Sequence, residues 1–247
     1  MRIGILGDVH SNLEALTVVI DRLRTTGVEH WVQVGDIVGY GADPVACIEI
    51  LRELRCTVCL GNHDAAVVGF IPTEYFNHFA RKAIEWTRDQ LRPTDLEYLR
   101  GLPLKVEHPH YTVVHGSLHL PEQFGYVFSP VEAADSIAKQ RTKVAFVGHS
   151  HIPAVYLHHT GGAPRDIQCV YESEFEVDIS KFDRALVNVG SVGQPRDEDP
   201  RAAYCVYDSD THLVRVSRVD YDIATTQQKI RQAGLPAVLA DRLSLGV

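Results

Sequence analysis

Five short segments of the chain place histidine, aspartate or asparagine directly after an apolar run. They are Gly7-Asp8-Val9-His10, Gly35-Asp36, Gly61-Asn62-His63-Asp64, Val113-Val114-His115-Gly116 and Gly148-His149-Ser150-His151. An apolar, β-branched run that stops at a glycine is typical of a buried strand followed by a tight turn. Because open α/β sheets carry their functional groups where strands end, all five segments can deliver side chains to one edge of a sheet.

The donors in these segments suit transition metals. The candidate ligands are Asp8, His10, Asp36, Asn62, His115, His149 and His151. Imidazole nitrogens combined with carboxylate or carboxamide oxygens favour Mn²⁺, Fe²⁺ or Zn²⁺, whereas calcium takes oxygen ligands and structural zinc usually takes cysteines. These residues are too many for one tetrahedral ion. They are enough for two ions that share a carboxylate and lie about 3.5–4 Å apart.

A pair of nearby histidines is a weak signal by itself, because most such pairs lie at the surface or have structural partners. His108 and His110 illustrate this alternative, since no apolar run ending in glycine precedes them. His149 and His151 differ because they follow Gly148 at the end of such a run. We therefore interpret His149 and His151 as metal ligands.

The first sixty residues repeat a strand–loop–helix unit, which is typical of a parallel sheet. Asn12 and Asp43 can cap the two helices, and Pro44 suits a first helical position. The expected elements are a strand at Arg2–Gly7, a helix at Leu13–Arg24, a strand at Trp31–Val34, a helix from Pro44 to Leu54 and a strand at Cys56–Leu60.

Residues 65–100 break this repeat. A helix is predicted from Thr73 to Leu91 and a shorter one from Pro93 to near Gly101. The first has an apolar face made by Phe76, Phe79, Ala80, Ala83 and Trp86. Such a face forms helix-packing core more often than a substrate pocket. We expect this helical insertion to cap a cleft.

The remainder is rich in predicted strands: Leu104–Glu107, Tyr111–His115, Lys143–Gly148, Ala154–His158, Glu174–Ile179, Ala185–Val189, Ala203–Tyr207 and His212–Val219. One helix is predicted at Pro130–Ala138 and a last amphipathic helix at Asp222–Gln232. The pattern favours a single α/β domain over residues 1–247, built as a two-sheet sandwich of mixed sheets flanked by helices.

Composition narrows the class of protein. The chain has 247 residues, 45% hydrophobic and 23% charged, as expected for one globular domain. A formal net charge of −8 argues against a nucleic-acid or anionic-membrane surface. No apolar run is long enough for a membrane span or a signal peptide. Cys56-x-x-Cys59 could be redox-active or half of a zinc site, but it lies in an apolar run. We expect buried, reduced thiols and a cytoplasmic location.

The order and spacing of the five segments resemble the five-block signature of the calcineurin-like metallophosphoesterases. The blocks span residues 7–151, and the β-rich remainder is compatible with the sandwich of that family. The resemblance implies two metal sites that share Asp36 as a bridging ligand. It assigns Asp8, His10, Asp36 and His151 to the first ion, and Asn62, His115 and His149 to the second.

The resemblance also implies a mechanism. A hydroxide bridging the two ions would attack phosphorus in line with the leaving oxygen. His63 would lie beside the leaving group, as proton donor or as a stabiliser of the phosphoryl group. Asp64 would orient the His63 imidazole, and a purely structural Asp64 is the alternative.

Two further stretches indicate the branch of the family. In Gly35-Asp36-Ile37-Val38-Gly39-Tyr40-Gly41, Tyr40 stands where the protein Ser/Thr phosphatase branch has an arginine that clamps phosphate. Gly190-Ser191-Val192-Gly193-Gln194-Pro195-Arg196 is similar to a stretch of the small prokaryotic phosphodiesterase branch. Arg196 and Tyr40 are therefore candidate substrate-binding residues, with a structural ion pair as the equal alternative for Arg196.

The predicted activity is that of a phosphodiesterase with two divalent transition metals, manganese favoured over iron, zinc or nickel. The substrate is predicted to be a small phosphorylated molecule, nucleotides included. Phosphomonoesterase or dinucleoside-polyphosphate hydrolase activity is the alternative within the enzymes. A non-catalytic scaffold of the same fold and a nuclease are the alternatives outside them. Oligomeric state is left open.

Overall fold

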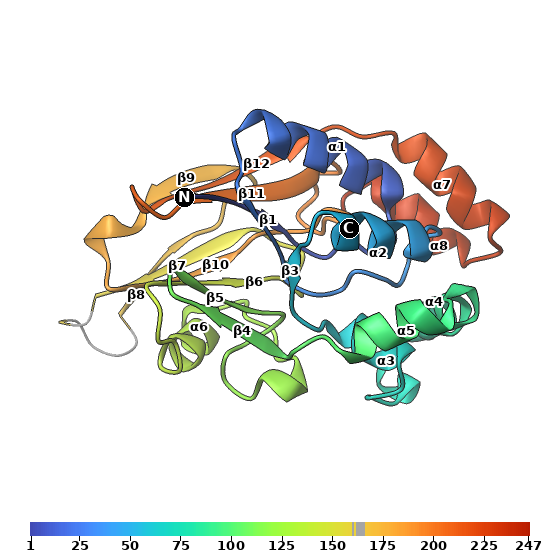
Figure 1. The fold of residues 1–247 in the computed structure, drawn as a ribbon, viewed down its shortest axis with the longest axis horizontal. Helices are drawn as coiled ribbons and strands as arrows, with labels where there is room; N and C mark the ends of the chain where they lie inside the picture. Colours follow the sequence, from blue (N-terminus) through green and yellow to red (C-terminus); the bar gives the residue numbers. More distant parts are fainter. Residues whose placement is uncertain (160, 162–165) are drawn as a thin grey trace.

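The computed structural model describes residues 1–159, 161 and 166–247 (Figure 1). Within these residues the strands form two six-stranded sheets. In spatial order, the first sheet contains β3 (Thr57–Val58), β2 (His30–Gln33), β1 (Arg2–Leu6), β11 (Ala202–Asp208), β12 (Leu213–Val219) and β9 (Phe175–Asp178). The second contains β4 (Lys105–His108), β5 (Tyr111–Val114), β6 (Val144–Val147), β10 (Arg184–Asn188), β7 (Ala154–His158) and β8 (Ile167–Val170).

Both sheets are mixed, which confirms the predicted sandwich. In the first sheet β1, β2 and β3 run parallel, and β11 is antiparallel to β1. In the second sheet β5, β6 and β10 run parallel, and the outer pairings are antiparallel. The parallel strands of both sheets therefore end on the same side, where the five sequence segments begin.

The main core lies between the two sheets. Alternate residues of each strand point inward, so Ile3 and Ile5 of β1 belong to the same buried cluster as Tyr111, Phe146 and Val187 from the second sheet. Apolar burial of this extent, at about 25 cal/mol per Å² of area removed from water, is the main stabilising contribution to the sandwich.

Helices cover the outer faces and one end (Figure 1). On the first sheet lie α1 (Leu13–Thr25) and α2 (Pro44–Glu53); α7 (Ile223–Gln232) packs beside α1, followed by α8 (Ala237–Asp241). On the second sheet lies α6 (Pro130–Ile137). A group at one end consists of α3 (Asn62–Val67), α4 (His78–Gln90) and α5 (Pro93–Arg100). Short 3₁₀ helices occupy Thr73–Tyr75 (η1), Pro121–Gln123 (η2), Ile179–Lys181 (η3) and Arg242–Ser244 (η4).

The prediction of a single helix from Thr73 to Leu91 is wrong, because an extended segment separates η1 from α4. Phe76 is extended, and the Asn77 side chain caps α4 by accepting the N–H groups of Phe79 and Ala80 at 3.0 Å. Phe79 is 46% exposed, so it lies outside the buried face of the helix. The predicted aromatic stripe is thus interrupted, because Phe76 lies in the extended segment before α4.

Other local predictions need correction as well. The second helix begins at Pro44 as predicted, but the Asp43 side chain makes no cap and instead pairs with Lys229 of α7 at 2.9 Å. The strand predicted at Cys56–Leu60 shortens to β3, since the Leu60 N–H donates to Pro103 O rather than to β2. Strand β8 and helix α8 were not predicted. The first two outcomes depend on partners distant in sequence, Lys229 for Asp43 and Pro103 for Leu60.

None of the helices within the described ranges is long and apolar enough to cross a bilayer. Cys56 and Cys59 remain unpaired thiols in this part of the chain. Burial raises the pKa of the Cys59 thiol well above its usual value, which is expected of an unreactive core cysteine.

Candidate metal centre

The five sequence segments meet where the parallel strands of both sheets end. Asp8 follows β1 and Asp36 follows β2 in the first sheet. His115 follows β5 and His149 follows β6 in the second. Asn62 is the first residue of α3. The site therefore lies between the two sheets.

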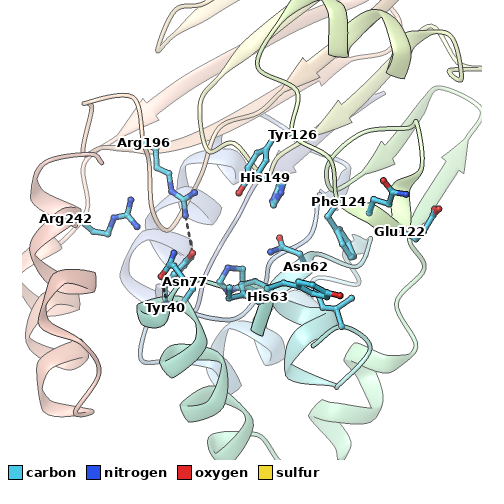
Figure 2. Close-up of a pocket in the computed structure, with 15 residues that line it drawn as sticks. Tyr40, Asn62, His63, Asn77, Glu122, Phe124, Tyr126, His149, Arg196 and Arg242 are labelled. Carbon is cyan, nitrogen blue, oxygen red and sulfur yellow. Dashed lines mark hydrogen bonds between the residues drawn. The ribbon is translucent and has the colours of Figure 1, made fainter. Parts of the chain in front are cut away.

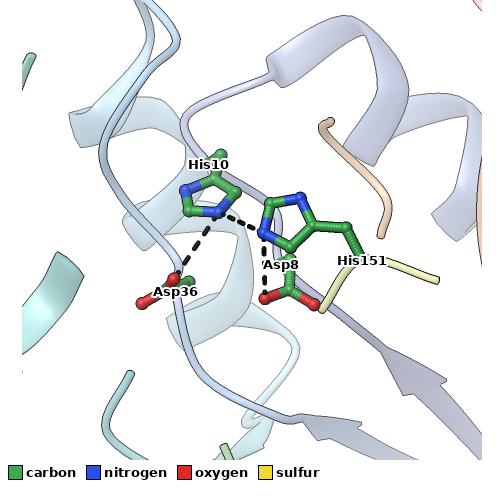
Figure 3. Close-up of side chains that lie close together, drawn as sticks. All are labelled: Asp8, His10, Asp36 and His151. Carbon is green, nitrogen blue, oxygen red and sulfur yellow. Dashed lines mark hydrogen bonds and ion pairs between the residues drawn. The ribbon is translucent and has the colours of Figure 1, made fainter. Parts of the chain in front are cut away.

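A first cluster brings together Asp8, His10, Asp36 and His151, whose ligand atoms all lie within 4.8 Å of one another (Figure 3). His10 Nε2 lies 3.5 Å from Asp36 Oδ2, and His151 Nε2 lies 3.6 Å from Asp8 Oδ1. The Nε2 atoms of His10 and His151 are 3.1 Å apart. All four side chains are buried. Two imidazole nitrogens this close to each other and to two carboxylates form a ready set of ligands.

A second cluster shares Asp36 with the first and adds His115 and His149. His115 Nε2 lies 3.3 Å from Asp36 Oδ2 and 3.1 Å from His149 Nδ1. Asn62 Oδ1 lies 3.0 Å from the same His115 nitrogen. Asp36 is thus placed between two groups of ligands, and its Oδ1 accepts the His63 N–H at 2.8 Å.

Backbone carbonyls orient three of the imidazoles. Nδ1 of His10 lies 3.0 Å from Val38 O, and Nδ1 of His115 lies 2.9 Å from Val34 O. His151 Nδ1 lies 2.6 Å from Gln194 O. A ring that donates its Nδ1–H to a carbonyl presents the lone pair of Nε2, and all three Nε2 atoms point into the clusters.

The backbone of the site is strained in a way that functional sites tolerate. Five of the candidate ligands have positive φ angles in the left-handed region, which costs non-glycine residues about 1–3 kcal/mol each. They are Asp8 (40°), His10 (48°), Asp36 (58°), His149 (68°) and His151 (62°). Local sequence preferences do not favour these angles, so long-range packing must impose them.

Glycine is required where the carboxylates approach the backbone. A Cβ added at Gly148 would lie 2.5 Å from Asp8 Oδ2, and one added at Gly61 would overlap Asp36 N and Oδ1. These glycines adjoin the ligands in sequence because only a residue without a side chain leaves room for the acidic groups.

The electrostatics of the site favour a bound cation. Burial raises the pKa of Asp8 to about 7 and lowers the pKa of His10, His149 and His151. Burial also acts to lower the pKa of His115. The carboxylates of Asp36 and Asp8 act in the opposite direction and outweigh burial, so the pKa of His115 is raised to about 9. The neutral imidazoles of His10, His149 and His151 suit divalent metal ions, and bound ions would replace the His115 imidazolium in stabilising the ionised acids.

His63 lies beside the clusters but outside them. Its ring packs against Tyr40 and Phe76, with centroids 4.4 and 5.1 Å away, and lies 4.8 Å from His10. Burial lowers the pKa of His63 to about 4. The buried Nδ1 atom has no hydrogen-bond partner among the described residues. An unpaired polar atom in this position is better explained by function than by stability.

The hydrogen bonds of the Asp64 carboxylate go to the backbone and not to the His63 ring. The Asp64 carboxylate accepts backbone N–H groups: Oδ2 from Asp36, Ile37 and Gly61 at 2.9, 3.3 and 3.1 Å, and Oδ1 from Val38 at 3.1 Å. Asp64 therefore holds the loop that carries Asp36 against the start of α3. This is the structural alternative weighed from the sequence.

Replacing Asp64 with alanine is expected to destabilise the fold by about 3 kcal/mol or more, since buried N–H groups left without an acceptor cost about 1–3 kcal/mol each. Urea unfolding monitored by fluorescence measures this loss, with Asp89→Ala on the exposed side of α4 as the control. Wild-type stability combined with lost activity would instead restore the orienting role.

A pocket of about 630 Å³ opens directly over Asn62, His63 and His149 (Figure 2). Tyr40 and Arg196, the predicted substrate-binding residues, both line it. Arg196 Nη2 donates to Gln194 Oε1 at 2.9 Å and lies 3.4 Å from Tyr40 Oη. In the described part of the chain Arg196 forms no ion pair with a carboxylate, which removes the structural ion pair as an explanation for it.

Several pocket residues were not predicted. The Tyr126 ring stacks on His149 with centroids 3.8 Å apart, and Phe124 and Arg242 complete other parts of the wall. Tyr126 follows Gly125 in a loop between two of the site segments, which was the available signal. Arg242 carries no such signal, because it lies in a C-terminal segment without a motif.

Comparison with known proteins places this geometry in a family. Residues 1–212 match the calcineurin-like phosphoesterase superfamily domain. An uncharacterized protein of Methanocaldococcus jannaschii is 36% identical over 248 residues, which are 99% of this chain and 98% of that protein. The crystal structure of a metallophosphoesterase from Sphaerobacter thermophilus is 40% identical, with a TM-score of 0.87 and 100% coverage of both chains. A hypothetical protein of Pyrococcus horikoshii OT3 shares the fold at 19% identity and a TM-score of 0.81, covering 100% of this chain and 98% of that one.

Proposed function

The chain belongs to the calcineurin-like phosphoesterase superfamily, and we propose that it is a phosphodiesterase that works with two divalent metal ions. The observation that carries this proposal is the position of Asp36 in both ligand clusters. A carboxylate shared by two sets of buried imidazoles is the arrangement that two-metal hydrolases use to hold ions a few ångströms apart.

The two ions would have separate ligand sets that share Asp36. When bound, they would supply an activated water and positive charge for the phosphoryl oxygens. The first set is Asp8, His10, Asp36 and His151, and the second is Asp36, Asn62, His115 and His149.

The remaining site residues act on the substrate. His63 is proposed to stand beside the leaving oxygen, where it donates a proton or a hydrogen bond. The Arg196 guanidinium, whose Nε is buried without a partner in the described residues, is proposed to contact a phosphate group of the substrate, with Tyr40 beside it. Residues 65–100 are proposed to cap the pocket, since Ile71, Tyr75, Phe76, Asn77 and Ala80 line it.

A diester is favoured over a monoester by the size of the pocket and the spread of its lining. The pocket has a volume of about 630 Å³, and lining residues lie on both sides of His63 and Asn62 (Figure 2), which suits a substrate with a group on each side of the phosphorus. A substrate panel tests this choice: bis-p-nitrophenyl phosphate, p-nitrophenyl phosphate, 2′,3′- and 3′,5′-cyclic nucleotides and diadenosine polyphosphates. Turnover of monoesters without diesters would overturn the diester proposal.

Metal dependence is the direct test of the proposed activity. Elemental analysis of the purified protein is expected to find about two transition-metal ions per chain. Chelation is expected to abolish bis-p-nitrophenyl phosphate hydrolysis and to lower the melting temperature, and added Mn²⁺ is expected to restore both, because ions that bind only the folded state stabilise it. If the reconstituted protein takes up no metal and has no activity, the result would favour a non-catalytic scaffold.

A further inference from the structure

Two arginines line the same side of the pocket. Figure 2 shows Arg196 and Arg242 together on one side, with Glu122 and Phe124 opposite. Neither arginine forms an ion pair with an acidic side chain within residues 1–159, 161 and 166–247. Adjacent cations repel each other, so an anionic ligand bound between them would lower the electrostatic energy of the pair.

Both guanidinium groups are held in place by oxygens outside the Asp and Glu side chains. Arg196 donates to the neutral oxygens of Gln194 and Tyr40, and its Nε is left without a partner. Arg242 Nε donates to a terminal oxygen of Val247, the last residue of the chain, which balances part of its charge. Burial and the charge of Arg196 lower the pKa of Arg242. Both groups therefore keep donors available to a ligand.

The C-terminal segment is built to deliver Arg242 to this place. Leu239 of α8 and Leu243 of η4 pack with Tyr40 and with Ala80 of α4 in one buried cluster. This packing fixes η4 beside the loop that follows β2 and brings Arg242 to the pocket wall. The family domain match ends at residue 212, so Arg242 lies outside the part of the chain that the family match covers.

We propose that Arg242, together with Arg196, forms a second anion subsite that binds a phosphate group other than the one being hydrolysed. The proposal rests on the proposed function, because the reacting phosphate is assigned to the metal clusters. Arginine suits this role since its planar guanidinium can make paired hydrogen bonds to phosphate. The substrate would then carry at least two phosphate groups.

The opposite side of the pocket suits the uncharged part of such a molecule. Phe124 and Tyr126 line the pocket, and Tyr126 is 45% exposed while it stacks on His149. Aromatic walls bind planar rings, and Glu122 would repel a phosphate from that side. The chemistry of the pocket therefore fits nucleoside polyphosphates, with their phosphates directed toward the arginines.

Binding to metal-free protein tests the subsite without using catalysis. In buffer with EDTA, titration calorimetry compares ADP with AMP. Wild type is expected to bind ADP about tenfold more tightly, as one additional charge-assisted contact predicts. Arg242→Gln is expected to lose this preference, and Arg242→Lys to keep part of it. The control is Arg231→Gln on α7, an exposed arginine paired with Asp241 at 2.6 Å, which is expected to behave as wild type.

Inhibition of the metal-loaded enzyme separates the two proposals. With free Mn²⁺ held constant, the ratio of inhibition constants for AMP and ADP against bis-p-nitrophenyl phosphate is expected to fall about tenfold in Arg242→Gln and to stay unchanged in Arg231→Gln. Equal affinities of wild type for ADP and AMP in both experiments would overturn the subsite, whether or not the diester is hydrolysed. An ADP preference that depends on Arg242, in a protein without hydrolytic activity, would support the subsite and overturn the proposed function.

Discussion

The variant Asp36→Asn is expected to hydrolyse bis-p-nitrophenyl phosphate about 1,000-fold more slowly than the wild type, a loss of about 4 kcal/mol in transition-state stabilisation. Asp36 belongs to both ligand clusters, and its Oδ2 lies 3.5 Å from His10 Nε2 and 3.3 Å from His115 Nε2. An amide at this position removes a negative charge from both proposed metal sites. The variant is therefore also expected to bind fewer than two ions per chain.

Asparagine is the sharpest substitution at this position because it leaves the local structure able to form. Asp36 Oδ1 accepts the His63 N–H, and the carbonyl oxygen of an asparagine can do the same. Metal content and kcat are measured on the same preparation, with the exposed Asp89→Asn as control. Full activity with two bound ions would contradict the bridging role of Asp36.

The variant His63→Ala is expected to lower kcat for the diester by about 10²- to 10⁴-fold, the range of general acid–base contributions. Its metal content is expected to stay at the wild-type value, because His63 belongs to neither cluster. Its melting temperature is expected to be unchanged or higher. Removal of the ring also removes Nδ1, a buried atom without a partner in the described residues, and the space left opens onto the pocket.

These readouts distinguish a catalytic His63 from a structural one. A structural role predicts loss of stability together with loss of activity, whereas a catalytic role predicts loss of kcat alone. His78→Ala, an exposed histidine at the start of α4, is the matched control. Wild-type turnover by His63→Ala would show that the proposed role is wrong, while leaving the metal proposal intact.

Much of the fold could be predicted because its signals are local. The strand–loop–helix repeat places β1, β2 and β3 in a parallel arrangement, and the structure confirms this. Predictions failed where a local signal competed with a distant partner. In the sequence Asp43 has the features of a helix cap. In the structure its carboxylate instead accepts a hydrogen bond from Lys229, which lies 186 residues away in the chain. Asn77 starts a helix inside a run whose apolar spacing predicts a continuous one.

The candidate ligands could be recognised from the sequence because each lies within four residues of the end of a strand. Asp8, Asp36, His115 and His149 each follow a strand in the structure, and glycine precedes three of them where a side chain would collide. The roles of neighbours were harder to predict. Asp64 follows His63 directly, yet its carboxylate binds the backbone of the Asp36 loop, 26 to 28 residues away.

The sequence by itself determined which side chains could bind metal and on which kind of element they lie, since strand periodicity, glycine and donor type are local properties. The tertiary structure alone decided that Asp36 lies between two ligand groups, that Asp64 supports the Asp36 loop, and that Arg242 reaches the pocket. The physical reason is that each of these outcomes depends on contacts between segments far apart in the chain. Packing of both sheets and the C-terminal helices sets those contacts, and spacing in sequence does not encode them.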